Sequence, residues 1–196
     1  MSARLALIIV DMMKVFFQQT EKLPASTTLA SVAENIKVLL DECRRAGIPV
    51  IYSNDAFNPA EAPIEPHFKI FGVHGIKGDP SSEVIDLLAP TKDDFVIEKR
   101  MYDGFFETRL DSVLRQLRVD TVIVTGTWTN ACVKHTVMGA WARSYNPIVP
   151  KEAVTCPDEK EHEWALRYME KFYAAKIVGL SDALNMIKNS EAQVKE

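Results

Sequence analysis

Three residues whose side chains can take part in nucleophilic chemistry lie next to apolar runs of the sequence. Asp11 follows LALIIV, Lys99 ends FVIEK, and Cys132 lies shortly after TVIVTG, at the start of a predicted helix. A thiol must ionise to attack a carbonyl carbon, and its pKa falls near a cation or a helix N-terminus. We therefore expect Cys132 to be a nucleophile of lowered pKa, Asp11 to accept the thiol proton, and Lys99 to stabilise both anions.

Each of these residues also has a purely structural interpretation. An aspartate at a strand end is commonly a turn former, and a lysine such as Lys99 is commonly a solvated charge. A cysteine in an apolar helix is more often part of the core, which is how we interpret Cys43. The sequence has three cysteines and no C-x-x-C pair, which argues against a disulfide framework and a zinc-thiolate site. Cys156 has no partner that the sequence identifies.

Apolar runs of strand length alternate with amphipathic stretches along the chain. The predicted strands cover residues 5–12, 48–55, 94–99, 120–126, 146–150 and 175–180, and the predicted helices cover residues 29–43, 82–88, 108–117, 131–144 and 159–173, followed by a polar tail. This regular order predicts an α/β fold with three α-β-α layers, in which helices cover both faces of a central, mostly parallel sheet of about six strands.

The predicted sheet brings the three reactive residues together. In an open parallel sheet, side chains from separate strands converge beyond the carboxyl ends of the strands, and ligands bind there. Asp11, Lys99 and Cys132 all lie at such ends, so we expect them to meet at one edge. Residues 56–80 contain several prolines and glycines and are typical of a long irregular loop, which often contributes to a site.

The composition indicates one globular domain that spans residues 1–196. Of the 196 residues, 47% are hydrophobic and 26% are charged, which suffices for one core of ordinary size. The net charge of −4 and the scattered basic residues argue against a nucleic-acid partner and favour a small molecule. No apolar run approaches the ~20 residues that span a bilayer, and Asp11 interrupts the first run too early for a signal peptide. We expect no membrane partner and a cytoplasmic protein.

Three sequence blocks resemble the isochorismatase-like cysteine hydrolases, the family of nicotinamidases and N-carbamoylsarcosine amidohydrolases. They are ALIIVDMMKVFF, VIEKRMYDGFFETRLDSVL and VTGTWTNACVKHTVMGAW, in the order that the family shows. The resemblance covers nearly the whole chain and implies the isochorismatase-like hydrolase fold, with Asp11, Lys99 and Cys132 as catalytic residues. It also implies a cis peptide between Thr127 and Trp128, and an oxyanion hole formed by the N–H groups of Trp128 and Cys132.

The implied activity is hydrolysis of a C–N bond in a small amide through a thioester on Cys132, as in nicotinamidases. Family members that cleave the vinyl ether of isochorismate lack this cysteine, so its presence favours an amide or ureido substrate. One alternative is an N-carbamoyl (ureido) amidohydrolase, whose substrate carboxylate calls for an arginine, and Arg100 is the candidate. Another is a member that binds a metabolite without catalysis, although binding alone needs no thiol.

A metal site is the second implication of the resemblance. Nicotinamidases carry D-x-H followed by further histidines that bind a divalent metal, and this chain has Asp55-Ala56-Phe57, with phenylalanine in place of the first histidine. Asp55, His67 and His74 remain as a ligand set for zinc, manganese or iron. The alternative is that His67 and His74 are loop residues that bind nothing. We expect no organic cofactor.

Aromatic residues are the candidates for the lining of a flat apolar pocket. Those in segments that face the site are Phe16, Tyr102, Phe105 and Trp128; they could equally pack in the core or at a subunit interface. We interpret His135 as a helix-surface or interface residue before a catalytic base, Trp141 and Trp164 as core residues, and PDEKEHE as a solvated helix start. We expect a small-molecule amide or ureido substrate and a homo-oligomer, either a dimer or a tetramer.

Overall fold

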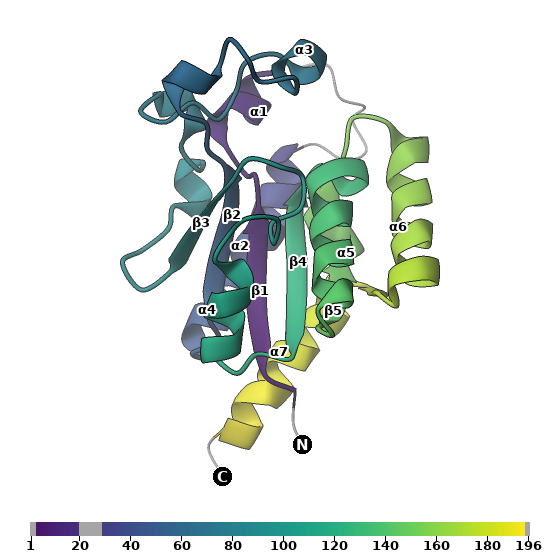
Figure 1. Cartoon of the computed structure of the whole chain (residues 1–196). Helices are drawn as coiled ribbons and strands as arrows, with labels where there is room; N and C mark the ends of the chain where they lie inside the picture. The colour runs from purple at the N-terminus through teal and green to yellow at the C-terminus, as the bar shows by residue number, and fades with distance from the viewer. Residues whose placement is uncertain (1–2, 20–28, 195–196) are drawn as a thin grey trace.

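The computed structural model describes residues 3–19 and 29–194. Its central layer is a seven-stranded sheet in the order β3-β2-β1-β4-β5-β7, with β6 paired to the end of β4. Figure 1 shows β3, β2, β1, β4 and β5 in this order. All strand pairs are parallel. The strands are β1 (Leu5–Val10), β2 (Val50–Asp55), β3 (Phe95–Lys99), β4 (Thr121–Thr127), β5 (Asn146–Pro150), β6 (Val154–Thr155) and β7 (Lys176–Val178).

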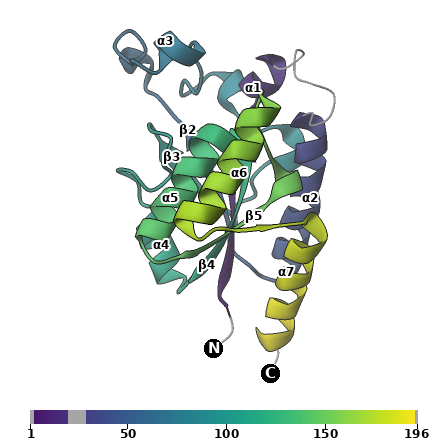
Figure 2. The same ribbon diagram turned by 90° about the vertical axis from the view of Figure 1, so that its right-hand side faces the viewer.

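Helices cover both faces of the sheet, as the sequence predicts. The helices are α1 (Lys14–Gln19), α2 (Leu29–Arg45), α3 (Phe68–Phe71), α4 (Leu110–Gln116), α5 (Lys134–Ala142), α6 (Glu159–Tyr173) and α7 (Leu180–Val194). Helices α2 and α7 pack on one face, and α4, α5 and α6 pack on the other (Figure 2). The predicted three-layer α/β fold is therefore confirmed, with one more short strand than expected.

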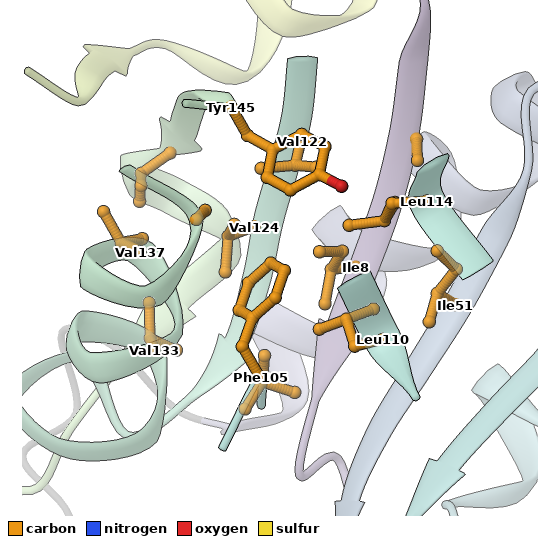
Figure 3. Close-up of a cluster of buried hydrophobic side chains, with 14 of the residues drawn as sticks. Ile8, Ile51, Phe105, Leu110, Leu114, Val122, Val124, Val133, Val137 and Tyr145 are labelled. Atoms are coloured by element: carbon orange, nitrogen blue, oxygen red, sulfur yellow. The ribbon is translucent and has the colours of Figure 1, made fainter. Parts of the chain in front are cut away.

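The apolar runs of β1 and β4 become the middle of this sheet because both of their faces are covered. Every residue of both strands is buried, which is the pattern of parallel strands between two helical layers. On one face, Ile8 and Val124 meet Leu110 of α4 and Val137 of α5 (Figure 3). Burial of each such side chain contributes about 1.5–3 kcal/mol to folding. The two strands thus form a rigid base for the residues that follow them.

Several sequence predictions about individual elements are wrong. Residues 82–88 do not form a helix, because only two short 3-10 turns form there, at Pro80–Ser82 and Asp86–Leu88. The expected polar tail is helix α7, which buries Ala183 and Ile187 against the sheet face that α2 covers. The two tryptophans expected in the core, Trp141 of α5 and Trp164 of α6, are each 47% exposed.

The first part of the chain that follows β2, which includes α3, lies beyond the carboxyl ends of the strands, where α1 also lies (Figure 1). Strand β1 has β2 on one side and β4 on the other, so the residues that follow these three strands emerge side by side. This is the place where open parallel sheets bind ligands. Among the described residues, no helix is both long and apolar enough to cross a membrane.

Candidate active site

The structure brings Asp11, Lys99 and Cys132 together at this edge. The Nζ atom of Lys99 lies 2.8 Å from Oδ2 of Asp11 and 3.6 Å from Sγ of Cys132. Asp11 and Lys99 are each 1% exposed and Cys132 is 6% exposed. A thiol, a carboxylate and an ammonium in mutual contact and away from water can carry out nucleophilic attack with proton transfer.

Asp11 is fixed through its backbone and its side chain. Its φ angle is 50°, a left-handed conformation that is uncommon for residues other than glycine. Its Oδ1 atom accepts a hydrogen bond of 2.8 Å from the backbone N–H of Asp55, and the hydroxyl of Thr127 donates a 3.0 Å hydrogen bond to its carbonyl oxygen. These contacts to the ends of β2 and β4 hold Oδ2 toward Lys99.

Asp55, which the sequence predicts only as a metal ligand, is a second carboxylate in the same cluster. It ends β2 and pairs in the sheet register with Lys99 of β3. Its Oδ1 accepts a hydrogen bond from the Lys99 ammonium, while its Oδ2 lies 3.3 Å from Nε2 of His74. Lys99 therefore lies between two buried carboxylates, Asp11 and Asp55.

The electrostatics of the cluster differ from expectation at the thiol. Burial raises the pKa of Cys132 well above its usual value, and the nearby Lys99 offsets this only in part. The expected lowering of the Cys132 pKa is therefore wrong, since loss of hydration outweighs the cation and the helix end. Burial and the negative charge of Asp55 also raise the pKa of Asp11, to about 6. Burial alone would lower the pKa of Lys99, but Asp11 and Asp55 more than compensate and raise it.

The turn that carries the thiol follows directly from β4. Gly126 has a φ angle of 107°, and a Cβ atom there would lie 2.0 Å from the carbonyl oxygen of Val10, so only glycine lets β4 approach β1 this closely. The Thr127–Trp128 peptide bond is cis. Residues Thr129–Val133, which we call the nucleophile turn, form a single π-helical turn before α5. Cys132 lies within this turn rather than in a regular α-helix.

A cavity of about 20 Å³ lies against the thiol, which is room for about one water molecule. Its lining consists of Phe16, Asp55, His67, His74, Tyr102, Trp128, Ala131 and Cys132. Three of the four aromatic residues predicted for the pocket are thus at the cavity. The prediction for Phe105 is wrong, because its ring lies in the core at 5.8 Å from the ring of Tyr145, among the side chains of Figure 3.

The residues predicted as metal ligands lie on the wall of this cavity. Asp55, His67 and His74 each offer a ligand atom, and these atoms lie within 4.8 Å of one another. The Nδ1 atom of His74 lies 2.8 Å from the carbonyl oxygen of Gly72, which directs Nε2 toward Asp55. Burial lowers the pKa of His74, but the hydrogen bonds to Asp55 and Gly72 and the nearby carboxylate charges together outweigh it and raise the pKa, so a metal ion would have to displace this proton. One carboxylate and two imidazoles form a donor set that fits a divalent ion with an open position.

Phe57, which occupies the position of the first metal-binding histidine in the nicotinamidase D-x-H motif, is completely buried. Its ring packs edge-on against His67 and His74, with ring centroids 6.3 and 6.0 Å away. The side of the cluster next to Phe57 is therefore apolar. The donor set that the described residues provide here stops at three protein ligands.

Arg100 lies outside the cavity, in a neighbouring groove. Its guanidinium lies 3.2 Å from a carboxylate oxygen of Glu61 and 3.3 Å from one of Glu65. The groove has a volume of about 360 Å³ and is lined by Ile64, Glu65, Pro66, His67, Ile70, Arg100, Met101 and Tyr102. His67 and Tyr102 also line the cavity, so these two rings form the wall between the groove and the thiol.

Cys43, Cys156 and His135 do not line the cavity next to the thiol. Cys43 is fully buried in the core, and burial raises its pKa to about 12, as expected for a core thiol. The thiol of Cys156 donates a hydrogen bond of 3.2 Å to the carbonyl oxygen of Asp158. His135 is half-buried, with its Nδ1 atom 2.8 Å from the carbonyl oxygen of Ala131 and its ring against Tyr102.

Solved structures with this fold include several hydrolases. N-carbamoylsarcosine amidase from Thermoplasma acidophilum aligns with a TM-score of 0.76 at 32% identity, over 90% of this chain and 96% of that chain. A cysteine hydrolase from Pseudomonas syringae pv. phaseolicola aligns with a TM-score of 0.84 at 29% identity, over 95% and 93% of the two chains. The pyrazinamidase/nicotinamidase from Streptococcus mutans aligns with a TM-score of 0.77 at 27% identity, over 89% and 99%.

Sequence comparison gives the same relationship. The uncharacterized isochorismatase family protein YaaI of Bacillus subtilis is 31% identical over 173 residues, which cover 88% of this chain and 92% of that protein. Ureidoacrylate amidohydrolase RutB of Yersinia enterocolitica is 32% identical over 169 residues, 76% of this chain and 74% of that protein. The profile of the Isochorismatase domain matches residues 5–179. The chain therefore belongs to the isochorismatase family of hydrolases.

Proposed function

We propose that this protein is a cysteine amidohydrolase that cleaves the C–N bond of a small amide through a thioester on Cys132. The observation that carries the proposal is the buried contact of Asp11, Lys99 and Cys132, in which Lys99 lies 2.8 Å from Asp11 and 3.6 Å from the thiol. Such a cluster supplies a nucleophile, a proton acceptor and a cation within one dry site. A protein that only binds a metabolite has no use for it.

The proposed reaction begins from the neutral thiol. The carboxylate of Asp11 accepts the proton of Cys132 while the sulfur attacks the carbonyl carbon, and the N–H groups of Trp128 and Cys132 hold the resulting oxyanion. Asp11 then gives the proton to the leaving nitrogen as the C–N bond breaks, which leaves an acyl group on the sulfur. Asp11 next accepts a proton from water as the water attacks the thioester. As the C–S bond breaks, Asp11 returns this proton to the sulfur, so the thiol is regenerated and the carboxylic acid product is released.

Lys99 and Asp55 both influence the pKa of Asp11, which must accept a proton in this reaction. The positive charge of Lys99 favours the ionised form of Asp11, whereas burial and Asp55 favour its protonated form. The resulting pKa of about 6 leaves Asp11 ionised at neutral pH, yet basic enough to accept a proton during the attack.

The surroundings of Arg100 support an uncharged substrate of the nicotinamide type over a ureido acid. The relatives named above include a ureidoacrylate amidohydrolase and an N-carbamoylsarcosine amidase, and a substrate carboxylate would need a cation. Here Arg100 already contacts Glu61 and Glu65, and the Glu65 side chain is only 6% exposed. The groove therefore presents a buried negative charge, which repels a carboxylate.

The cluster of Asp55, His67 and His74 supports a divalent metal ion, either zinc, manganese or iron, as part of the proposed substrate site. When bound, the ion would supply a Lewis-acid position for a ring nitrogen or a water molecule at the side of the cavity. The chain's own contribution is to hold the imidazole of His74 by the carbonyl group of Gly72 and so to fix one ligand atom.

An ammonia-release assay over four compounds tests the proposal: nicotinamide, pyrazinamide, N-carbamoylsarcosine and ureidoacrylate. We expect the two uncharged amides to be hydrolysed faster than the two carboxylates, and the Cys132→Ala variant to hydrolyse none of them. Faster hydrolysis of the carboxylates would favour the ureido alternative. Equal rates for Cys132→Ala and the wild type would contradict the proposed function.

A further inference from the structure

We propose that His162 is a positioning residue for the nucleophile, because it holds the turn that carries Cys132. This inference rests on the proposed function of Cys132. His162 lies in the first turns of α6, within the stretch PDEKEHE that the sequence suggests is solvated.

The contact between His162 and the nucleophile turn is made by a buried hydroxyl. Thr129, the first residue of the turn, is completely buried. Its Oγ1 atom lies 2.9 Å from Nδ1 of His162, which is a hydrogen-bond distance whichever of the two atoms carries the shared proton. A buried hydroxyl without a partner costs about 1–3 kcal/mol. Thr129 therefore keeps its position only while His162 stays beside it.

A second contact joins the same two segments. The side-chain amide of Asn130 donates a hydrogen bond to the carboxylate of Glu161. Two successive residues of α6, Glu161 and His162, thus bind two successive residues of the nucleophile turn, Thr129 and Asn130. A pair of adjacent contacts fixes both the position and the rotation of the turn.

The start of α6 is itself tied to the end of β4. Strand β6 pairs with Gly126 and Thr127, just before the turn. Asp158 then caps α6, since its side chain accepts a 3.0 Å hydrogen bond from the N–H of Glu161, and the thiol of Cys156 donates to the Asp158 carbonyl oxygen. The chain thus closes a ring of contacts from β4 through the turn to α6 and back through β6. Cys156 contributes its hydrogen bond with Asp158 to this ring of contacts.

The nucleophile turn needs such support because it is not a regular α-helix. The N–H groups of Ala131 and Val133 both donate to the carbonyl oxygen of Trp128, at 3.0 and 3.2 Å, in place of a regular ladder of bonds. Single π-helical turns are rare and often occur at functional sites. A misplacement of a reacting group by about 1 Å can reduce the rate on the order of a hundredfold. The side-chain contacts from α6 select the conformation in which Sγ of Cys132 faces Asp11 and Lys99.

The test uses variants that remove or preserve the hydrogen bond. His162→Ala and Thr129→Val remove it. His162→Asn preserves it, because an asparagine side-chain amide reaches the position of Nδ1, and Thr129→Ser keeps the hydroxyl. Glu163→Gln, an exposed change on the same helix, is the matched control. For each purified variant we would measure kcat and KM on an amide that the wild type hydrolyses, and the rate at which iodoacetamide alkylates Cys132, followed by peptide mass.

We expect His162→Ala and Thr129→Val to lower kcat and the alkylation rate about tenfold or more, with little change in KM. His162→Asn and Thr129→Ser should retain most of the wild-type kcat and alkylation rate, and Glu163→Gln should match the wild type in both. The double variant that carries both His162→Ala and Thr129→Val should have a kcat no lower than that of either single variant, because all three proteins lack the same hydrogen bond.

Two results would overturn the proposal. One is a His162→Ala protein whose kcat and Cys132 alkylation rate equal those of the wild type. The other is a loss that His162→Asn and Thr129→Ser do not recover and that follows the melting temperature alone, which is the signature of a merely structural role. Absence of turnover by the wild type would contradict the proposed function instead, whereas the alkylation ratio would still decide the role of His162.

Discussion

Lys99 and Asp11 form a buried ion pair, with 2.8 Å between Nζ and Oδ2, although Asp11 follows β1 and Lys99 ends β3. Asp55 binds the same ammonium group from the other side. Two carboxylates thus share one cation, so the cluster has an excess negative charge when both are ionised. Burial, together with this excess negative charge, explains why the pKa of Asp11 is raised to about 6 and why the Cys132 thiol is neutral.

The raised pKa of Asp11 predicts the pH dependence of the activity. Asp11 must be ionised to accept the thiol proton, so the rate should fall as the pH decreases through about 6. The profile of kcat/KM against pH for the free enzyme should show an acidic limb near that value. Asp11→Asn should be inactive at every pH. A profile that stays flat well below this value would show that Asp11 is not the proton acceptor.

Lys99 should be essential for stability as well as for chemistry. Lys99→Met leaves two buried carboxylates without their cation, which should cost about 3–5 kcal/mol of unfolding free energy near neutral pH. The deficit should shrink as the pH falls, because the carboxylates can then bind protons. Urea unfolding at two pH values measures both effects. Lys77→Met is the control, since Lys77 and Glu98 form an exposed pair whose loss costs only about 0–1 kcal/mol. Equal deficits for the two variants would contradict the prediction.

The metal proposal predicts a stoichiometric ion. Protein purified without chelator should contain about one zinc, manganese or iron ion per chain, because Asp55, His67 and His74 present converging ligand atoms. His74→Ala should lose the ion, whereas His135→Ala, which changes a histidine outside this group, should retain it. Elemental analysis gives the count. Full activity of metal-free protein after chelator treatment would show that the loop histidines are not functional ligands.

Glu65 should reject substrates that carry a carboxylate. Glu65→Gln removes a largely buried negative charge and releases a nitrogen atom of Arg100 from its contact. We expect kcat/KM for ureidoacrylate to rise several-fold relative to nicotinamide, because charge-assisted hydrogen bonds to a carboxylate become available. Glu170→Gln, an exposed change on α6, should leave the ratio unchanged. An unaltered ratio for Glu65→Gln would place the substrate away from this groove.

The fold and the meeting of Asp11, Lys99 and Cys132 could be predicted from the sequence, because buried parallel strands appear as apolar runs and their carboxyl ends share one edge. The bond between Asp55 and Lys99 could not, since it depends on the register of β2 and β3. The raised pKa of Cys132 could not be predicted either. Helix position and charge can be read from the sequence, but depth of burial cannot, and burial is the larger effect here.

The packing of α6 and α7 also could not be predicted in full from the local sequence. The spacing of apolar residues predicts α6, but its buried residues are Ala165 and Met169, so the adjacent Trp164 points outward. The sequence does not predict helix α7 because, of residues 180–190, whose side chains the structure describes, only Ala183 and Ile187 are buried among many polar residues. The contact of His162 with Thr129 joins segments far apart in the chain, and no local pattern indicates it.

Removal of the thiol should separate chemistry from stability. Cys132→Ala should abolish turnover and leave the fold intact, and Cys132→Ser should be nearly inactive, because an alcohol is far harder to ionise and Asp11 is a weak base. Cys43→Ala is the matched control: it should retain activity and lose on the order of 1 kcal/mol of stability. Turnover and thermal unfolding of the three variants check this. Substantial activity in Cys132→Ala would point to a different nucleophile.

Transfer of an acyl group to Cys132 is the defining step of the proposed reaction, and rapid-quench intact-mass spectrometry detects it. The wild type is mixed with an amide that it hydrolyses, quenched in acid before the steady state, and weighed, and the peptide that contains Cys132 is then identified. We expect a mass increase equal to the acyl group, located on Cys132 and absent from Cys132→Ala. A Cys132→Ala protein that hydrolyses the same amide at the wild-type rate, with no adduct on either protein, would contradict it.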